Sequence, residues 1–207
     1  MKERIRVLTL LLLGAAALAL APAPRHAPTG TATFAGGCFW SMQRIFDNVP
    51  GVVTATVGYS GGQKKNPTYQ QVSTGTTGHL ESVQVVYDPA RVSYETLLDT
   101  YWHNIDPLQA DGQFCDHGSE YHTAIFYADS TQQRIAEESK RRLAERFGQP
   151  IATIIIPAAP FYAAEEYHQH FYRKNPEHYE GYRRGCGQDS RLEERWGKPG
   201  AASAGGR

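Results

Sequence analysis

Cys38 is the residue whose position most favours covalent chemistry. It follows Gly36 and Gly37, which end a predicted strand in a tight turn, and it begins a predicted helix that runs to about Asp47. Unpaired N–H groups and the helix dipole at such a position favour a thiolate, so a lowered cysteine pKa is predicted. A thiolate is a nucleophile. On placement alone, a buried cysteine that packs as a small apolar side chain is an equal alternative.

The other two cysteines bear on the same question. The chain contains Cys38, Cys115 and Cys186. In an oxidising compartment an odd number leaves at least one thiol that is unpaired or that cycles between states. Three scattered cysteines are also too few for a disulfide scaffold. The cysteine count therefore favours chemistry over a purely structural role.

The N-terminal residues predict export. Three basic residues in the first six positions precede an apolar run, Val7–Leu20, and small residues follow it. This is the pattern of a secretory signal with cleavage near Ala19. The run is short for a membrane span, which needs about 20 apolar residues. We expect a periplasmic protein, with anchoring by an uncleaved signal as the alternative.

The balanced charge argues against anionic partners. Lys plus Arg and Asp plus Glu both number 21, so the formal net charge is zero and neither nucleic acid nor an acidic membrane is an expected partner.

The predicted organisation is a signal peptide at 1–20, a linker at 21–30, one catalytic domain at 31–197 and a disordered tail at 198–207.

The pattern of the domain predicts an α+β fold. Strands and helices are expected in the order β-α-β-β-α-β-α-β, with Ile151–Ile156 as a buried strand and Ala163–Phe171 as a helix. This order predicts a two-layer sandwich with a mixed sheet and a ferredoxin-like core, extended loops and a C-terminal coil.

His168 and His170 next to two glutamates do not predict a metal site, because positions two apart do not share a helix face. We expect them on a solvated helix face.

An ordered set of short motifs runs from about Thr33 to Trp196. The segments are Gly36-Gly37-Cys38-Phe39-Trp40, Pro50-Gly51-Val52, Gly58-Tyr59-Ser60-Gly61-Gly62, Asn66-Pro67-Thr68-Tyr69, Gly75-Thr76-Thr77-Gly78-His79 with Glu81, Tyr87-Asp88-Pro89, Asp106-Pro107, Asp116-His117-Gly118 with Tyr121, and Phe161-Tyr162-Ala163-Ala164-Glu165. This set resembles peptide methionine sulfoxide reductase type A. The resemblance implies reduction of the S-epimer of methionine sulfoxide, free or in proteins, and hence repair of oxidised proteins.

The resemblance also implies roles for individual residues. Cys38 is implied as the nucleophile and Glu81 as the proton donor. The sequence supports Glu81 independently, since it shares strand parity with Val83 and Val85. If that face meets the core, desolvation raises the carboxyl pKa and keeps the acid protonated.

The remaining implied roles concern substrate binding. Two tyrosines are implied as hydrogen-bond donors to the sulfoxide oxygen, an aromatic pair as the wall for the methyl group, and an Asp-His pair as further substrate contacts. These residues are Tyr69 and Tyr121, Phe39 and Trp40, and Asp116 and His117. Without the motif, Asp116 is equally well read as a turn residue before Gly118.

Resolution of a Cys38 sulfenic acid requires a second thiol. Cys186 is expected in that role because the glycines on either side allow its backbone to move. Cys115 departs from many relatives, which have an amide residue there, and it is either a bystander or a second resolving cysteine that takes the first disulfide with Cys38 before Cys186 does. The resemblance implies no bound cofactor, no metal, a monomer, and thioredoxin or a thioredoxin-like protein as reductant.

Two other functions use the same residues. A thiol-disulfide oxidoreductase or thiol peroxidase would also employ Cys38, but the chain has no Cys-x-x-Cys motif and this function leaves Glu81 and the tyrosines unexplained. A non-catalytic secreted binding domain would use Cys115 and Cys186 as a structural disulfide.

Overall fold

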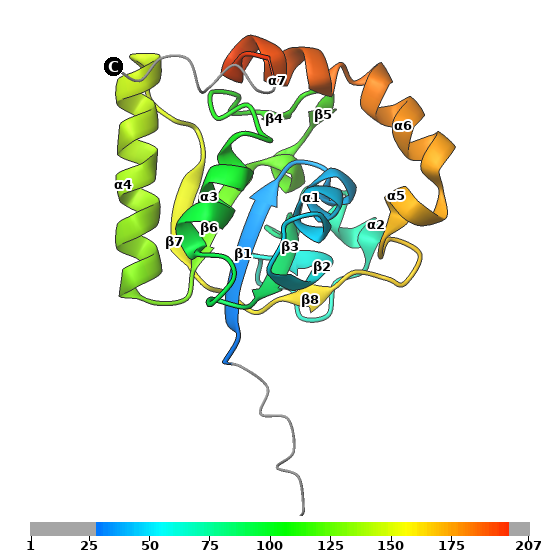
Figure 1. Ribbon diagram of the computed structural model, residues 1–207. Coiled ribbons are helices and arrows are strands. Elements are labelled where there is room, and N and C mark those ends of the chain that lie inside the picture. The colour runs from blue at the N-terminus through cyan, green and yellow to red at the C-terminus, as the bar shows by residue number, and fades with distance from the viewer. Residues whose placement is uncertain (1–27, 199–207) are drawn as a thin grey trace, which may run out of the picture.

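The computed structural model describes residues 28–198, whose strands form a six-stranded sheet in the order β7-β6-β1-β3-β2-β8 (Figure 1). Neighbouring strands are antiparallel except β6 and β7, which are parallel. The strands are β1 Gly30–Gly36, β2 Val52–Ser60, β3 Leu80–Tyr87, β6 Thr123–Tyr127, β7 Ile154–Pro157 and β8 Tyr162–Ala163. A small second sheet pairs β4 Gly112–Gln113 with β5 Asp116–His117.

The helices follow the strands in an α+β order. They are α1 Phe39–Asp47, α2 Tyr69–Val72, α3 Tyr94–Trp102, η1 Ser119–Tyr121, α4 Ser130–Phe147, α5 Phe171–Lys174, α6 Pro176–Gly185 and α7 Gln188–Trp196. The central strand order β6-β1-β3-β2, with α1 after β1 and α3 after β3, is the β-α-β-β-α-β arrangement of a ferredoxin-like unit. The predicted α+β class and mixed sheet are confirmed.

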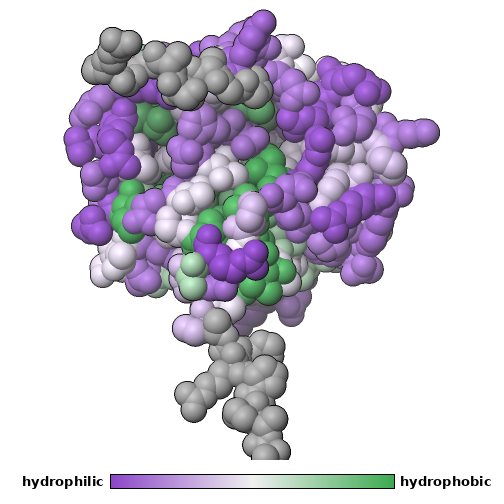
Figure 2. Space-filling view, in the orientation of Figure 1, coloured by the Kyte–Doolittle hydropathy of each residue, from purple (hydrophilic) through white to green (hydrophobic). Residues whose placement is uncertain are grey.

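Helices α1, α3 and α4 share one core with the sheet. Phe34 of β1 stacks against Phe46 of α1 and Tyr101 of α3, with ring centroids 5.1 Å apart in both pairs. Ala136 of α4 belongs to the same buried cluster. The outer face of these elements is mostly hydrophilic, with an apolar strip near the centre of the view (Figure 2). One helical layer therefore covers the face of the sheet on which the site residues are found.

The register of β3 decides where Glu81 points. Glu81 pairs with Tyr59 of β2 and alternates with its neighbours so that it shares a face with Val83 and Val85, both fully buried in the main core. Glu81 is only 3% exposed. The expectation that this parity faces the core is confirmed.

The C-terminal region departs from the predicted coil. It contains α5, α6 and α7, and α7 is fastened to the domain by Arg195, whose Nε lies 2.8 Å from an oxygen of buried Asp106. The Trp196 indole N–H also donates to the Ile105 carbonyl oxygen at 3.0 Å. These polar anchors lie far apart in sequence, so apolar periodicity alone did not reveal them.

Two predicted elements were also wrong in their bounds. The residues from Ala163 to Phe171 are not one helix, because Tyr162–Ala163 adds a strand to β2 and a helix starts only at Phe171. The strand predicted at Ile151–Ile156 is Ile154–Pro157, and it lies at the edge of the sheet with partly exposed residues.

The described residues contain no helix that is both long and apolar enough to cross a membrane. The predicted signal peptide at 1–20 lies outside the described residues, as do residues 21–27 of the predicted linker and residues 199–207 of the predicted tail.

Candidate active site

Cys38 lies at the point where β1 turns into α1. Gly37 has φ +78°, and a Cβ there would lie 2.5 Å from the Gln113 side chain, so the turn requires glycine. Cys38 is the N-cap residue, and its carbonyl accepts from the Ser41 N–H at 3.2 Å. The predicted position of the thiol at a helix start is confirmed.

The free amides of α1 do not make Cys38 acidic. Burial raises the pKa of the thiol well above its usual value, and the nearby Glu81 and Asp116 carboxyls raise it further; hydrogen bonds with the Tyr182 hydroxyl and the Trp40 N–H oppose the rise without cancelling it. The Phe39 N–H donates to Glu81 Oε2 at 3.0 Å, so a carboxyl oxygen takes this donor of the first turn. The predicted lowering of the Cys38 pKa is therefore wrong, and the resting residue is a thiol.

Glu81 is a buried acid directly below the helix start. Desolvation raises its pKa to about 8, and Asp116 and Glu120 add to the shift although the hydrogen bond from Phe39 opposes it. A carboxyl group with this pKa holds its proton at neutral pH. The group is therefore able to donate a proton beside the Cys38 sulfur.

Tyr69 and Tyr121 flank the same acid. The pKa of both hydroxyls is raised by desolvation first and by the Glu81 charge second, with a smaller contribution from Cys38. Tyr69 is positioned through its backbone, because its N–H donates to Glu165 Oε1 at 2.9 Å while Tyr59 donates to the other oxygen at 2.8 Å. The two predicted tyrosines thus keep their protons and lie near the sulfur.

An aromatic wall stands beside Cys38. The Trp40 ring is stacked on Phe171 with centroids 3.8 Å apart, and its indole N–H donates to His168 Nδ1 at 3.0 Å. Phe39 is 1% exposed and its ring centroid lies 5.0 Å from that of His168. His168 itself is 2% exposed, so the prediction that it occupies a solvated helix face is wrong.

The side chains of Asp116 and His117 point in different directions. Asp116 accepts a hydrogen bond from the Tyr182 hydroxyl, and desolvation raises its pKa. The imidazole of His117 is largely exposed and its Nδ1 lies 3.0 Å from Asp111 Oδ2. Adjacent strand residues point to opposite faces. Only Asp116 therefore joins the side chains around the thiol, which we call the Cys38 cluster and which comprise Cys38, Glu81, Tyr69, Tyr121 and Asp116. The predicted contact of His117 with substrate is not supported.

Cys115 and Cys186 form a disulfide, with Cα atoms 4.9 Å apart, while Cys38 is free. Both sulfur atoms lie within 4.8 Å of an Asp116 carboxylate oxygen. Cys115 is exposed and Cys186 is half-buried. The two sulfur atoms of the disulfide thus lie next to the carboxyl group that influences Cys38.

The sequence interpretation did not identify Tyr182. Its hydroxyl donates to Asp116, accepts from the Gln188 amide at 3.1 Å, and lies beside the Cys38 thiol. A signal was available, since Tyr182 precedes Cys186, the C-cap residue of α6, by four residues, a spacing that places both on one side of the helix.

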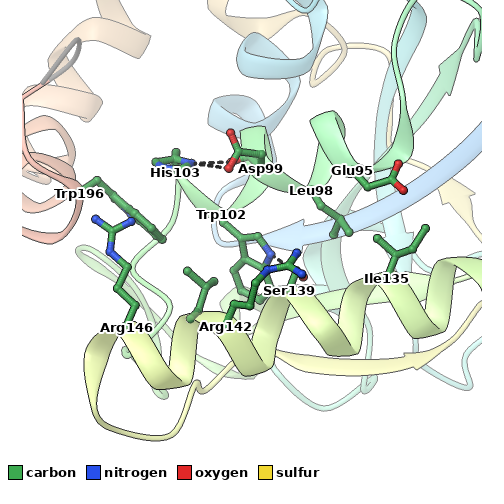
Figure 3. Close-up of a pocket in the computed structure, with 11 residues that line it drawn as sticks. Glu95, Leu98, Asp99, Trp102, His103, Ile135, Ser139, Arg142, Arg146 and Trp196 are labelled. Carbon is green, nitrogen blue, oxygen red and sulfur yellow. Dashed lines mark hydrogen bonds and ion pairs between the residues drawn. The ribbon is translucent and has the colours of Figure 1, made fainter. Parts of the chain in front are cut away.

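A separate cleft lies between α3 and α4 (Figure 3). Its volume is about 150 Å³, and its lining includes Trp102, Ser139, Arg142, Arg146 and Trp196. The Trp102 indole N–H donates to the Ser139 hydroxyl at 3.0 Å. None of the site residues above lines this cleft. It is therefore a groove between helices that is separate from the residues around Cys38.

A sulfur nucleophile beside a protonated carboxyl, with a disulfide nearby, defines a thiol-dependent oxidoreductase. The family described as "Peptide methionine sulfoxide reductase" matches residues 30–200. The MsrA protein of Bacillus licheniformis is 52% identical over 169 residues, which cover 81% of this chain and 93% of the relative. The Bacillus subtilis MsrA is 53% identical over 168 residues, which cover 80% and 95%.

Solved structures agree with the sequence relatives. Reduced Mxr1 from Saccharomyces cerevisiae has a TM-score of 0.69 at 30% identity over 72% of this chain and 87% of its own. Methionine sulfoxide reductase A of Corynebacterium diphtheriae has a TM-score of 0.65 at 36% identity, covering 72% and 76%. The chain belongs to the peptide methionine sulfoxide reductase MsrA family, and its activity is that of a peptide-methionine (S)-S-oxide reductase.

Proposed function

We propose that this chain reduces the S-epimer of methionine sulfoxide, free or in proteins, through a sulfenic acid on Cys38, and so repairs oxidised proteins. The observation that carries the proposal is the protonated, buried Glu81 beside the Cys38 thiol. A soft nucleophile for sulfur and an acid for the departing oxygen are the two groups that sulfoxide reduction requires. A thiol peroxidase or a disulfide exchanger needs the thiol but not this acid.

In the first step the Cys38 sulfur attacks the sulfoxide. The sulfoxide S–O bond breaks, the oxygen becomes bound to Cys38 as a sulfenic acid, and the sulfide product is methionine. Glu81 gives the oxygen its proton, and the Tyr69 and Tyr121 hydroxyls donate hydrogen bonds to it while its negative charge grows. Phe39 and Trp40 supply the apolar wall for the methyl group.

In the second step a thiol removes the sulfenic oxygen. With all three cysteines reduced, Cys186 attacks the Cys38 sulfenic acid, water leaves, and a Cys38–Cys186 disulfide forms. Cys115 then attacks the Cys186 sulfur, which frees the Cys38 thiol and leaves Cys115–Cys186. The arrangement with a free Cys38 and a Cys115–Cys186 disulfide is the product of this sequence. Cys115 thus has the role of a second resolving cysteine.

One turnover of the fully reduced protein tests this order. After addition of one equivalent of the S-epimer of methionine sulfoxide, quenching with an alkylating agent and mass mapping should show Cys38–Cys186 first and Cys115–Cys186 later. The Cys115→Ser variant should stop at Cys38–Cys186, and the Cys186→Ser variant should accumulate oxidised Cys38.

The outcome that contradicts the order is a Cys115–Cys186 disulfide that persists through reduction and turnover while Cys38 cycles alone. That result would make the disulfide structural. Absence of any methionine formed by the reduced wild-type protein would contradict the proposed function itself.

A thioredoxin-like protein is the proposed reductant, and no bound cofactor or metal is required for these steps. The yeast protein Mxr1 has been crystallised in complex with Trx2. In this chain Cys115 is the more exposed sulfur of the disulfide, which makes it accessible to an attacking thiolate of a donor.

We propose that the protein is exported to the periplasm, from the signal pattern at 1–20. Expression of the full chain followed by fractionation should place the mature protein in the periplasmic fraction, with its N-terminus near residue 20 by mass. A protein of full-length mass in the membrane fraction would instead indicate an uncleaved anchor, and full-length protein in the cytosol would contradict export.

A further inference from the structure

The raised pKa of Cys38 means that the residues described so far include no base that removes the thiol proton. Attack on a sulfoxide needs the thiolate form of Cys38, but the resting group is a thiol. Glu81 does not serve as the base, because its own pKa is about 8 and the reaction needs it as an acid. Some other group must therefore take the thiol proton.

Asp116 is connected to Cys38 through one hydroxyl group. The Tyr182 hydroxyl donates its hydrogen bond to Asp116 Oδ2. The Tyr182 hydroxyl oxygen also accepts a hydrogen bond from Gln188 Nε2 at 3.1 Å, and this hydroxyl lies beside the Cys38 thiol. A hydroxyl group has one proton to donate and two lone pairs that accept, so with its proton on Asp116 and one lone pair on Gln188, the other lone pair is available to the thiol.

The direction of this hydroxyl is fixed by its buried neighbour. Gln188 is 1% exposed, and its Oε1 accepts from the Ser41 hydroxyl at 3.1 Å and from Arg183 Nη1 at 3.1 Å. Because the amide oxygen is occupied by two donors, the amide nitrogen must face Tyr182. The network therefore orients Tyr182 as an acceptor toward Cys38 and a donor toward Asp116.

Tyr182 itself does not ionise. Burial and the neighbouring Cys38 and Asp116 raise its pKa far above the usual value. A group of this kind passes a proton by accepting one while it donates another, with no stable phenolate between. Asp116 is the acceptor at the end of the path.

We propose that Asp116, acting through the Tyr182 hydroxyl, is the base that removes the proton of the Cys38 thiol as the sulfur attacks. The inference rests on the proposed function, and it deepens the substrate-binding role implied for Asp116. The thiol proton passes to Tyr182 and the Tyr182 proton to Asp116. Glu81 protonates the departing oxygen, so the products are the sulfide, the sulfenic acid, a protonated Asp116 and an ionised Glu81. A proton then returns from Asp116 to Glu81 through water.

The Tyr182→Phe variant tests the relay directly, since it removes the hydroxyl and keeps the ring. The rate of the first step at neutral pH should fall by about 10²-fold or more, in the range of general base catalysis. Tyr172→Phe is the matched control, because Tyr172 also donates to a carboxylate, Asp47 Oδ2 at 2.8 Å, and Asp47 is the last residue of α1, at the opposite end of the helix from Cys38. It should retain the wild-type rate.

The pH dependence of alkylation separates a proton relay from a structural role. In the oxidised protein Cys38 is the free thiol, so iodoacetamide reports on it without any sulfoxide. In the wild type the alkylation rate should change little between about pH 6 and 8, because the base is internal. In Tyr182→Phe and in Asp116→Asn it should rise about tenfold per pH unit, because the thiolate then forms only by exchange with water.

Wild-type pH dependence of alkylation in both variants would overturn the relay, as would an unchanged first-step rate in Tyr182→Phe. The two variants together guard against misfolding, and thermal unfolding of each is compared with the wild type. If alkylation changes as expected but the wild-type protein does not reduce methionine sulfoxide, the relay stands and the proposed function fails.

Discussion

Replacement of Cys38 by serine is expected to abolish methionine formation, with a loss of roughly 10⁴-fold or more, as for removal of the nucleophile in other covalent enzymes. Serine keeps the size and the N-cap position of Cys38. Its hydroxyl is a poor nucleophile toward sulfoxide sulfur, and it forms no sulfenic acid. Methionine released from the S-epimer of methionine sulfoxide in one turnover measures the effect.

The stability of the Cys38→Ser variant is the control that separates loss of the nucleophile from loss of the fold. Serine is a favoured N-cap residue, so the free energy of unfolding should stay near the wild-type value. The Cys115–Cys186 disulfide should still form on oxidation. A folded variant that regenerates methionine at the wild-type rate would eliminate Cys38 as the nucleophile.

The Glu81→Gln variant is expected to slow the first step by about 10² to 10⁴-fold, the usual range for loss of a general acid. Glutamine keeps the shape and still accepts the hydrogen bond from Phe39, but it has no proton to give. The thiol should remain reactive toward iodoacetamide. Rapid-quench measurement of methionine separates the two readouts.

The pH profile gives this prediction a second test. The active form of Glu81 is the protonated acid with a pKa of about 8, so the wild-type rate of the first step should fall as pH rises through about 8. Glu81→Gln should lose that decline. Glu120→Gln is the matched control, because it removes another buried carboxyl near the site; it should keep the rate below the decline and should keep the decline itself, moved to lower pH because Glu120 helps to raise the pKa of Glu81. An unchanged rate in Glu81→Gln would remove Glu81 from the chemistry.

Local patterns were sufficient for the parts of the site that depend on local structure. Gly36 and Gly37 before Cys38 predicted the turn and the helix start. Strand alternation placed Glu81 on the face of Val83 and Val85, and the sheet register confirms this. The motif set placed Tyr69 and Tyr121 near one another.

The sequence could not predict features that arise from distant contacts. The pKa of Cys38 is raised because segments far apart in sequence remove water from it and bring two carboxyl groups close. His168 is buried because rings from distant segments pack around it, among them Trp40, 128 residues earlier, which also donates to its Nδ1. The orientation of His117 away from the cluster depends on the pairing of β4 with β5. Each of these strands has two residues, too few for an alternating pattern that would predict them from the sequence.

Helix α6 and the residue that caps it carry two functional groups one turn apart, Tyr182 and Cys186. The Cys186 N–H donates to the Tyr182 carbonyl at 2.9 Å, so the hydroxyl and the resolving sulfur are parts of one rigid unit. A shift of this helix that brings Cys186 onto the oxidised Cys38 also carries the Tyr182 hydroxyl away from its place between Cys38 and Asp116. If α6 moves as a unit in this way, removal of the thiol proton and removal of the sulfenic oxygen belong to two different positions of the helix and follow one another in time.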